Sequence, residues 1–113
     1  MEQVFEKIKS SAIKISLVEE GEEVGRAFLY IIKNDLHLSP YGLMEDVFVI
    51  ESKRGLGLGK ELVRLISNEA QKQGCYKLIC TSRDVNEKVH KLYKKLGFSE
   101  HGKEFRMQLK NPD

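Results

Sequence analysis

Apolar and polar side chains alternate over much of the first fifty residues, as they do in half-buried β-strands. Ala12–Glu19 follows this alternation, and Val24–Lys33 continues it with β-branched and aromatic residues. Because the intervening segment Glu20–Glu22 contains a glycine, these two strands are predicted to form a hairpin. A third strand is predicted over Tyr41–Ile50, and its unbroken apolar end, Val47–Ile50, is typical of a central strand covered on both faces.

Beyond residue 51 the apolar spacing changes from the period of a strand to that of a helix. Leu58–Ala70 carries apolar residues at close to helical intervals, and Gly74 is placed to end this helix. Tyr76–Thr81 has the pattern of another buried strand. Asp84–Glu87 resembles a capping box with its acid at the cap, so a second helix is expected to begin there and to end at Gly97.

The last part of the chain is expected to close the sheet. Phe98–Glu100 and Glu104–Leu109, separated by His101-Gly102, are predicted to form a hairpin, and residues 1–11 leave room for a first strand. No internal repeat, low-complexity tract or linker divides the chain, so residues 1–113 are expected to form a single domain. The order of elements predicts a mixed α/β, or α+β, sheet.

Composition excludes several classes of protein. Hydrophobic residues make up 41% and charged residues 32% of the 113 residues, a globular balance that argues against disorder. The net charge of +2 is too small to indicate a nucleic-acid partner. No apolar run approaches the ~20 residues of a membrane span, and the N-terminus lacks the apolar core of a signal peptide. A cytoplasmic protein without a membrane partner is therefore expected.

The two cysteines, Cys75 and Cys80, are expected to be free thiols. Their odd separation along one strand would point the side chains to opposite faces, which prevents both a disulfide and a shared metal ion. Three histidines are the remaining candidates for metal ligands, so no metal site is expected.

The most informative segment joins the third strand to the first helix. Three alternating glycines, Gly55, Gly57 and Gly59, allow the backbone to turn tightly with its N–H groups exposed. The helix N-terminus that follows adds unpaired N–H groups and the positive end of the helix dipole. Together with the positive charges of Arg54 and Lys60, this turn is predicted to bind a phosphate group. Its spacing fits neither a P-loop nor a dinucleotide fingerprint.

The spacing does fit Arg-x-x-Gly-x-Gly, with Arg54, Gly57 and Gly59 at the defined positions after a V-x-V strand end. This is the pyrophosphate-binding signature of the GNAT superfamily of acyl-CoA-dependent N-acyltransferases, which the chain resembles. A second segment of that family, N-x(6)-Y-x-x-x-G-F, is matched by Asn86 and Leu92–Phe98. The two motifs occur in the family's order, with the expected strand and helix between them.

The resemblance implies a GNAT-like twisted mixed sheet of about six to seven strands with two main helices. The family's usual N-terminal helix pair is expected to be lacking, since the first hairpin takes up more than half of the residues before Tyr41. Acetyl-CoA is the implied acyl donor. The residues that the resemblance assigns to donor binding are Val47, Phe48, Val49, Arg54, Gly55, Leu56, Gly57, Leu58, Gly59, Lys60, Asn86 and Tyr93.

Two side chains are assigned catalytic roles. Tyr93 is implied to protonate the leaving thiolate, although a core aromatic on the helix stripe is the alternative interpretation. Glu45 is the first choice for the base that deprotonates the amine, because in a regular strand it shares a face with Val47 and Val49. Asp46 is the second choice, because a bulge would swap the faces. A polar residue at the sheet rim, without a catalytic role, is an equal alternative for Glu45.

The resulting hypothesis is an N-acetyltransferase that acts by direct attack of a primary amine in a ternary complex. The acceptor is either a small polyamine-like amine, since Glu45-Asp46 is similar to the pattern of diamine acetyltransferases, or a protein lysine or N-terminus, which an open groove would suit. A homodimer could instead supply the missing wall of the groove. The alternative from another class is a non-catalytic acyl-CoA-binding or regulatory module.

Overall fold

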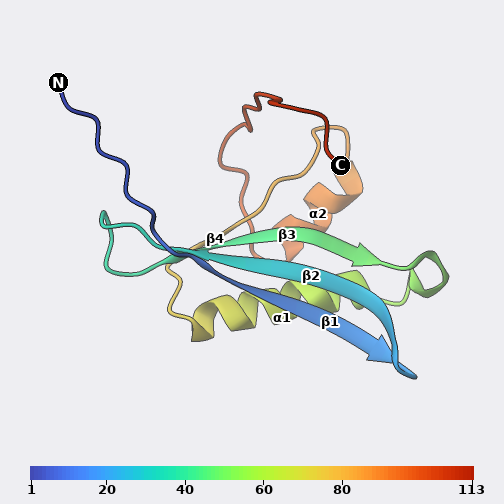
Figure 1. Ribbon diagram of the computed structural model, residues 1–113. Helices are drawn as coiled ribbons and strands as arrows, with labels where there is room; N and C mark the ends of the chain where they lie inside the picture. Colours follow the sequence, from blue (N-terminus) through green and yellow to red (C-terminus); the bar gives the residue numbers. More distant parts are fainter. The chain divides into compact units, whose positions relative to one another are not determined.

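The computed structural model describes residues 1–113 and consists of two compact units, residues 1–80 and residues 81–113. Figure 1 shows the helices and strands of both units. The first unit contains β1 (Ser11–Glu19), β2 (Glu22–Ile32), β3 (Tyr41–Val49), the 3₁₀-helix η1 (Glu51–Lys53), α1 (Leu58–Lys72) and β4 (Leu78–Ile79). The second unit contains α2 (Glu87–Lys95).

The first unit is built on a four-stranded sheet in the order β1-β2-β3-β4 (Figure 1). β1 pairs with β2 and β2 with β3 in antiparallel fashion, whereas β4 runs parallel to β3. The predicted first hairpin is confirmed. Its turn places Glu20 and Gly21 at φ values of 51° and 79°, and such paired positive angles match the right-handed twist of the two strands.

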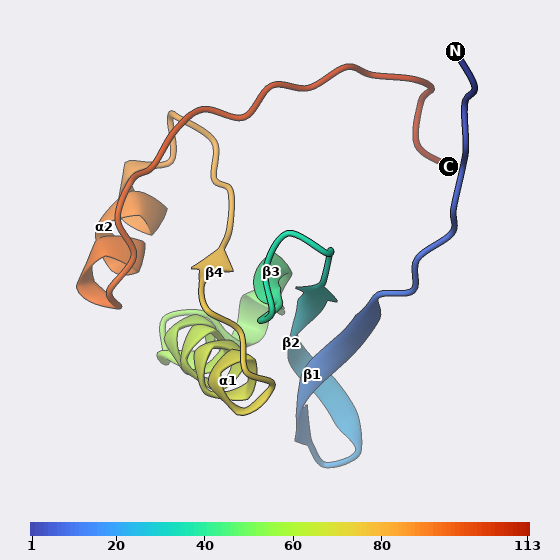
Figure 2. The ribbon, with the colours of Figure 1, turned by 90° about the vertical axis from the view of Figure 1, so that its left-hand side faces the viewer.

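The core lies between one face of this sheet and α1, which runs along that face (Figure 2). Its members are apolar residues of β2, β3 and α1: Val24, Ala27, Leu29, Ile31, Met44, Leu62, Val63, Ile66 and Ala70. Gly42 lies where β3 meets this core, and a Cβ there would stand 3.0 Å from the side chain of Leu29 and 3.1 Å from that of Leu78. A larger residue at this position would push the strands and helix apart.

β3 is not a regular strand. Opposite it, Arg26 pairs with Phe48 and Phe28 pairs with Glu45, so three steps along β3 match two steps along β2. The extra residue is a β-bulge, and Asp46 has the left-handed φ of 53° at this point. Consequently Glu45 and Phe48 lie on the sheet face away from α1, while Val47 and Val49 lie on the α1 face. The expectation that Glu45 shares a face with Val47 and Val49 is therefore wrong.

The sheet is also smaller than expected, with four strands instead of six to seven. Phe98–Glu100 and Glu104–Leu109 form no strands, and neither do residues 1–10. The alternating side chains of Phe105, Met107 and Leu109 remain exposed. Alternation supplies one apolar face, but a strand also needs a partner that accepts and donates its backbone hydrogen bonds.

The helix boundaries largely follow the predictions, with one correction. α1 ends shortly before Gly74, which adopts the expected left-handed φ of 79°. In the second unit, α2 is capped by Asn86 rather than by Asp84, because the side-chain oxygen of Asn86 accepts a hydrogen bond from the N–H of Val89 at 3.4 Å. Neither helix is both long and apolar enough to cross a membrane.

Candidate active site

The candidate site begins where β3 and β4 part. The two strands pair only at Gly42 and Leu43, opposite Leu78 and Ile79, and β3 then continues to Val49 without a partner on that side. The unpaired length of β3 is an open sheet edge, on which backbone N–H and C=O groups are available to a ligand.

Alternation decides which residues face this open edge. The N–H of Ile50 donates to the carbonyl of Val24 at 3.0 Å, so Ile50 faces β2, as does Phe48 two residues earlier. Val47 and Val49 therefore direct their backbone groups away from β2 toward the open edge. Two of the three residues expected to bind the donor through their backbones have the required orientation, and Phe48 does not.

The glycine turn follows directly after η1. Gly55 and Gly57 have φ values of 81° and 83°, angles that favour glycine, and Gly57 is the N-cap of α1. The first helical hydrogen bond runs from the N–H of Glu61 to the carbonyl of Gly57. The three preceding amides, of residues 58–60, have no backbone acceptor, and they lie at the positive end of the helix dipole.

Open space and charge around the turn fit an anionic group. A Cβ built at Gly55, Gly57 or Gly59 would meet no atom within 4 Å, so a ligand can approach the backbone there. The ammonium of Lys60 forms no ion pair. Lys53, by contrast, is held by Glu19 at 2.9 Å. The open backbone, the unpaired amides and the charge of Lys60 are of the kind that binds phosphate, and phosphate binding by this turn stays a prediction.

The side chain of Arg54 contacts the end of β3. Its Nε donates a hydrogen bond to the carbonyl of Val49 at 2.9 Å, and its guanidinium lies 5.5 Å from the centre of the Phe48 ring. The side chain therefore turns back onto the end of β3. Sequence reasoning placed Arg54 in the cradle as a positive charge and had no signal for this second contact.

A shallow, open cavity of about 400 Å³ lies on the sheet face away from α1. It is lined by Ser10, Tyr30, Ile32, Leu43 and Glu45. Glu45 reaches this cavity because it alternates regularly with Leu43 in the part of β3 that precedes the bulge, whereas Asp46 is exposed and does not line the cavity. Tyr30 and Leu43 were missed as site residues, although their position on the same strand face as Glu45 follows once the register of β2 and β3 is known.

The cysteines near the site are poor nucleophiles. Burial, with a further contribution from the negative charge of Glu45, raises the pKa of the Cys80 thiol to about 11. Burial also raises the pKa of Cys75. Because the thiolate is the reactive form of cysteine, neither side chain is prepared at neutral pH to carry an acyl group.

Asn86 and Tyr93 belong to the second unit. The side chain of Asn86 caps α2, as described above, and the ring of Tyr93 packs against Phe98 with centroids 5.4 Å apart. The carbonyl of Tyr93 also accepts a hydrogen bond from the N–H of Phe98 at 2.9 Å. The family segment from Asn86 to Phe98 is thus a capped helix whose tyrosine is packed at the turn that ends it.

The sequence profile of the Acetyltransferase (GNAT) family matches residues 2–98. The chain belongs to this family. Among curated proteins, it is 43% identical over 68 residues to a glucosamine 6-phosphate N-acetyltransferase of Trypanosoma brucei brucei, which covers 60% of this chain and 44% of that protein. It is 34% identical over 99 residues to a probable enzyme of the same name in Drosophila melanogaster, covering 83% of this chain and again 44% of the relative. The chain thus spans about half the length of the curated relatives that it matches.

Solved structures confirm the GNAT-like fold. An acetyltransferase of Trypanosoma brucei aligns with a TM-score of 0.76 and 34% identity, over 87% of this chain and 69% of that one. The glucosamine-6-phosphate N-acetyltransferase of Arabidopsis thaliana aligns with a TM-score of 0.78 and 26% identity, over 88% of this chain and 67% of that one. The resemblance inferred from the two motifs is therefore correct.

Proposed function

We propose that this GNAT protein transfers an acetyl group from acetyl-CoA to a primary amine by direct attack. The observation that carries the proposal is the glycine turn with its unpaired amides, which closely follows the end of β3, where that strand has no partner on the β4 side. When bound, acetyl-CoA supplies a thioester whose acetyl group an amine can accept. The protein has to bind this donor, deprotonate the amine and protonate the departing thiolate.

Donor binding rests on backbone groups. The amides of Gly55, Leu56, Gly57, Leu58, Gly59 and Lys60 bind the diphosphate, with the ammonium of Lys60 adding positive charge. The backbone groups of Val47 and the N–H of Val49 bind the arm of the donor at the open edge. An N–H group fixed in a strand stabilises negative charge that develops on the thioester oxygen without having to reorganise.

Glu45 is proposed as the base. A free alkylammonium has a pKa of about 10.4, so the amine must lose a proton before it can attack. Glu45 is the only acid that lines the cavity on the sheet face away from α1, called the outer sheet face from here on. The position of Glu45 supports this choice over Asp46, because Glu45 lines the cavity in which an acceptor would lie and Asp46 does not.

Tyr93 is proposed to protonate the departing thiolate, and Asn86 to contact the donor. The support is their place in the family segment, together with the role of Asn86 in capping the helix that carries Tyr93. The raised pKa values of both cysteines support direct transfer rather than an acyl-enzyme.

The relatives named glucosamine 6-phosphate N-acetyltransferase make that amino-sugar phosphate the first acceptor to test. A small amine is also favoured by a mouse relative named thialysine N-epsilon-acetyltransferase, 33% identical over 54 residues. We therefore place a small amine ahead of a protein lysine or N-terminus.

A second copy of the chain over the outer sheet face would enclose such an acceptor. The solution mass, measured by light scattering, tests this homodimer, and the mass of a monomer would reject it.

The deciding experiment measures CoA release from acetyl-CoA with glucosamine 6-phosphate, glucosamine, spermidine and a lysine peptide, with mass spectrometry of each product. Amide formation on one of these amines is the expected result. Tyr93→Phe is expected to slow thiol release, with Tyr76→Phe as a matched control. If no amine is acetylated while acetyl-CoA still binds, the protein is a binding module and the proposed activity is wrong.

A further inference from the structure

Arg54 links the two halves of the proposed donor site. Its Nε–H donates to the carbonyl of Val49, the last residue of β3. Arg54 itself is followed directly by Gly55, the first glycine of the turn. This is the only side-chain hydrogen bond between the segment that carries the glycine turn and β3. The bond closes the loop formed by η1 and fixes where the turn begins.

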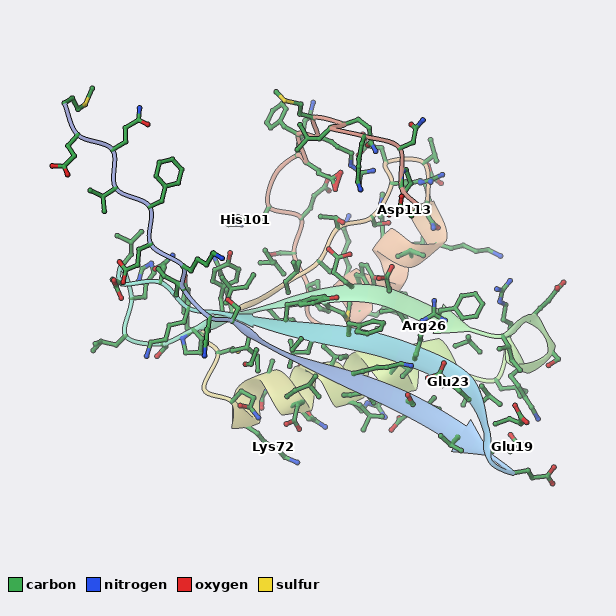
Figure 3. All side chains as sticks on the ribbon, in the orientation of Figure 1. Glu19, Glu23, Arg26, Lys72, His101 and Asp113 are labelled. Atoms are coloured by element: carbon green, nitrogen blue, oxygen red, sulfur yellow. The ribbon has the colours of Figure 1, made fainter.

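A second contact supports the same orientation. The guanidinium of Arg54 lies 5.5 Å from the centre of the Phe48 ring, and that of Arg26 lies 4.7 Å from the same centre. Arg26 is on β2, where Figure 3 labels it, and it makes no side-chain hydrogen bond or ion pair. Stacking on an aromatic face restrains a guanidinium while leaving its N–H groups available. Phe48 thus helps to hold Arg54 against the strand end.

The bond also consumes a group on the open edge. The carbonyl of Val49 points away from β2, and with Arg54 bound to it, only the N–H of Val49 remains available there. A donor held by the turn at one end and by β3 at the other requires a fixed spacing between these two sites. Small errors in such spacing are costly, because displacement of a reacting group by about 1 Å can lower a rate by 10²-fold.

We propose that Arg54 is a positioning residue, which sets the glycine turn against the end of β3 through its hydrogen bond to Val49 rather than by its charge on the diphosphate. The inference rests on the proposed function, because it assumes that both sites serve one donor. It assigns a structural role at the end of β3 to the arginine of the Arg-x-x-Gly-x-Gly motif.

Two substitutions separate the hydrogen bond from the charge. In Arg54→Gln, the amide nitrogen of the side chain is as many bonds from Cα as Nε is in arginine, so the hydrogen-bond donor is kept and the charge is lost. In Arg54→Lys, a methylene replaces Nε and the charge is kept one atom further out. Arg54→Met removes both. Arg26→Gln is the matched control, because Arg26 stacks on the same ring without a bond to the strand.

Each variant is assayed with two donors, acetyl-CoA and S-acetylpantetheine, which lacks the diphosphate. Arg54→Met is expected to lower kcat/KM at least about tenfold with acetyl-CoA, since a lost charged hydrogen bond is worth about that factor. With S-acetylpantetheine it should change kcat/KM by less than about twofold, because that donor has no diphosphate for the turn to hold. Arg54→Gln should recover most of the loss and Arg54→Lys less, while Arg26→Gln stays within about twofold. Rescue by Arg54→Lys without rescue by Arg54→Gln would overturn the proposal, because the charge and not the hydrogen bond to Val49 would then matter.

A measurement without turnover keeps this result separate from the proposed function. Hydrogen–deuterium exchange at the hydrogen-bonded amides that flank the turn, those of Lys53 and Glu61, is expected to be faster in Arg54→Met than in the wild type, and unchanged in Arg26→Gln. Unchanged exchange in Arg54→Met means that Arg54 does not hold the turn, whatever the activity. If the wild-type protein acetylates no amine but the exchange differs as expected, the proposed function fails and the positioning role stands.

Discussion

The two faces of the sheet have opposite characters. The face under α1 is closed by apolar side chains such as Leu29, Leu62 and Ile66, each fully buried. The other face carries rings and charges, and it includes the open cavity beside Glu45. One face of the sheet therefore supplies stability, and the other is the place of the proposed chemistry. Like any strand, β3 contributes residues to both faces, and the bulge at Asp46 places Val47 and Val49 on the face opposite to Glu45.

The largest expected effect tests the outer face. Glu45→Gln should lower kcat by about 10²- to 10⁴-fold, because general base catalysis typically contributes that factor. The melting temperature should stay close to that of the wild type, since Glu45 is not part of the core.

Asp46→Asn is the matched control for this prediction. It removes the neighbouring carboxylate, and asparagine tolerates the left-handed backbone that Asp46 adopts. Its activity is expected to remain near that of the wild type. An equal loss in both variants would mean that lining the cavity does not single out Glu45 as the base.

The second prediction concerns the α1 face. Leu62→Ala should lower the free energy of unfolding by about 2–5 kcal/mol, because it leaves a cavity in a side-chain layer with 0% exposure. Leu36→Ala makes the same chemical change at a side chain that is 82% exposed, and it should change stability by less than about 0.5 kcal/mol. Urea unfolding measures both, and similar values would show that the core lies elsewhere.

A smaller effect is expected at the turn that joins the sheet to α1. Gly57→Ala forces a side chain into a φ of 83° and should cost about 1–2 kcal/mol of stability, with weaker acetyl-CoA binding. Gly59 already lies inside α1, where alanine is the better helix former. Gly59→Ala should therefore leave unfolding unchanged or raise the stability slightly, and an equal loss at both positions would argue against the left-handed cap.

The smallest effect concerns Cys80, whose pKa is raised to about 11 by burial first and by Glu45 second. Because the folded state holds the thiol proton more tightly than the unfolded chain, this contribution to stability is present below about pH 9 and is lost between about pH 9 and 11. Partial exposure limits it to about 1 kcal/mol or less. The difference in unfolding free energy between wild type and Cys80→Ala should shrink over that range, and a constant difference would contradict the shift.

Several features of the fold could be read from the sequence because they depend on neighbouring residues. Alternation gave the strands of the first hairpin, and helical spacing with a glycine stop gave α1. The glycine turn was predictable for the same reason, since Gly55 and Gly57 are required by backbone angles within the turn itself. The cap of α2 was misplaced by two residues, because both Asp84 and Asn86 have side chains that can accept from a helix N-terminus.

Other features depend on how residues distant in the sequence pair, and the sequence did not reveal them. The bulge at Asp46 arises because β3 has one more residue than β2 over the same stretch of pairing, and it places Val47 and Val49 on the face opposite to Glu45. The alternation in Glu104–Leu109 predicted a strand, but no edge pairs with it.

The sequence by itself thus determined the glycine turn and the family to which the chain belongs, because both depend on local backbone requirements. The tertiary structure decided the side of the sheet on which Glu45 lies and the backbone group that Arg54 binds. Both depend on the register between strands and on the path of the chain after β3. Hydrogen bonding and packing between distant segments set that register and that path, and local pattern does not specify them.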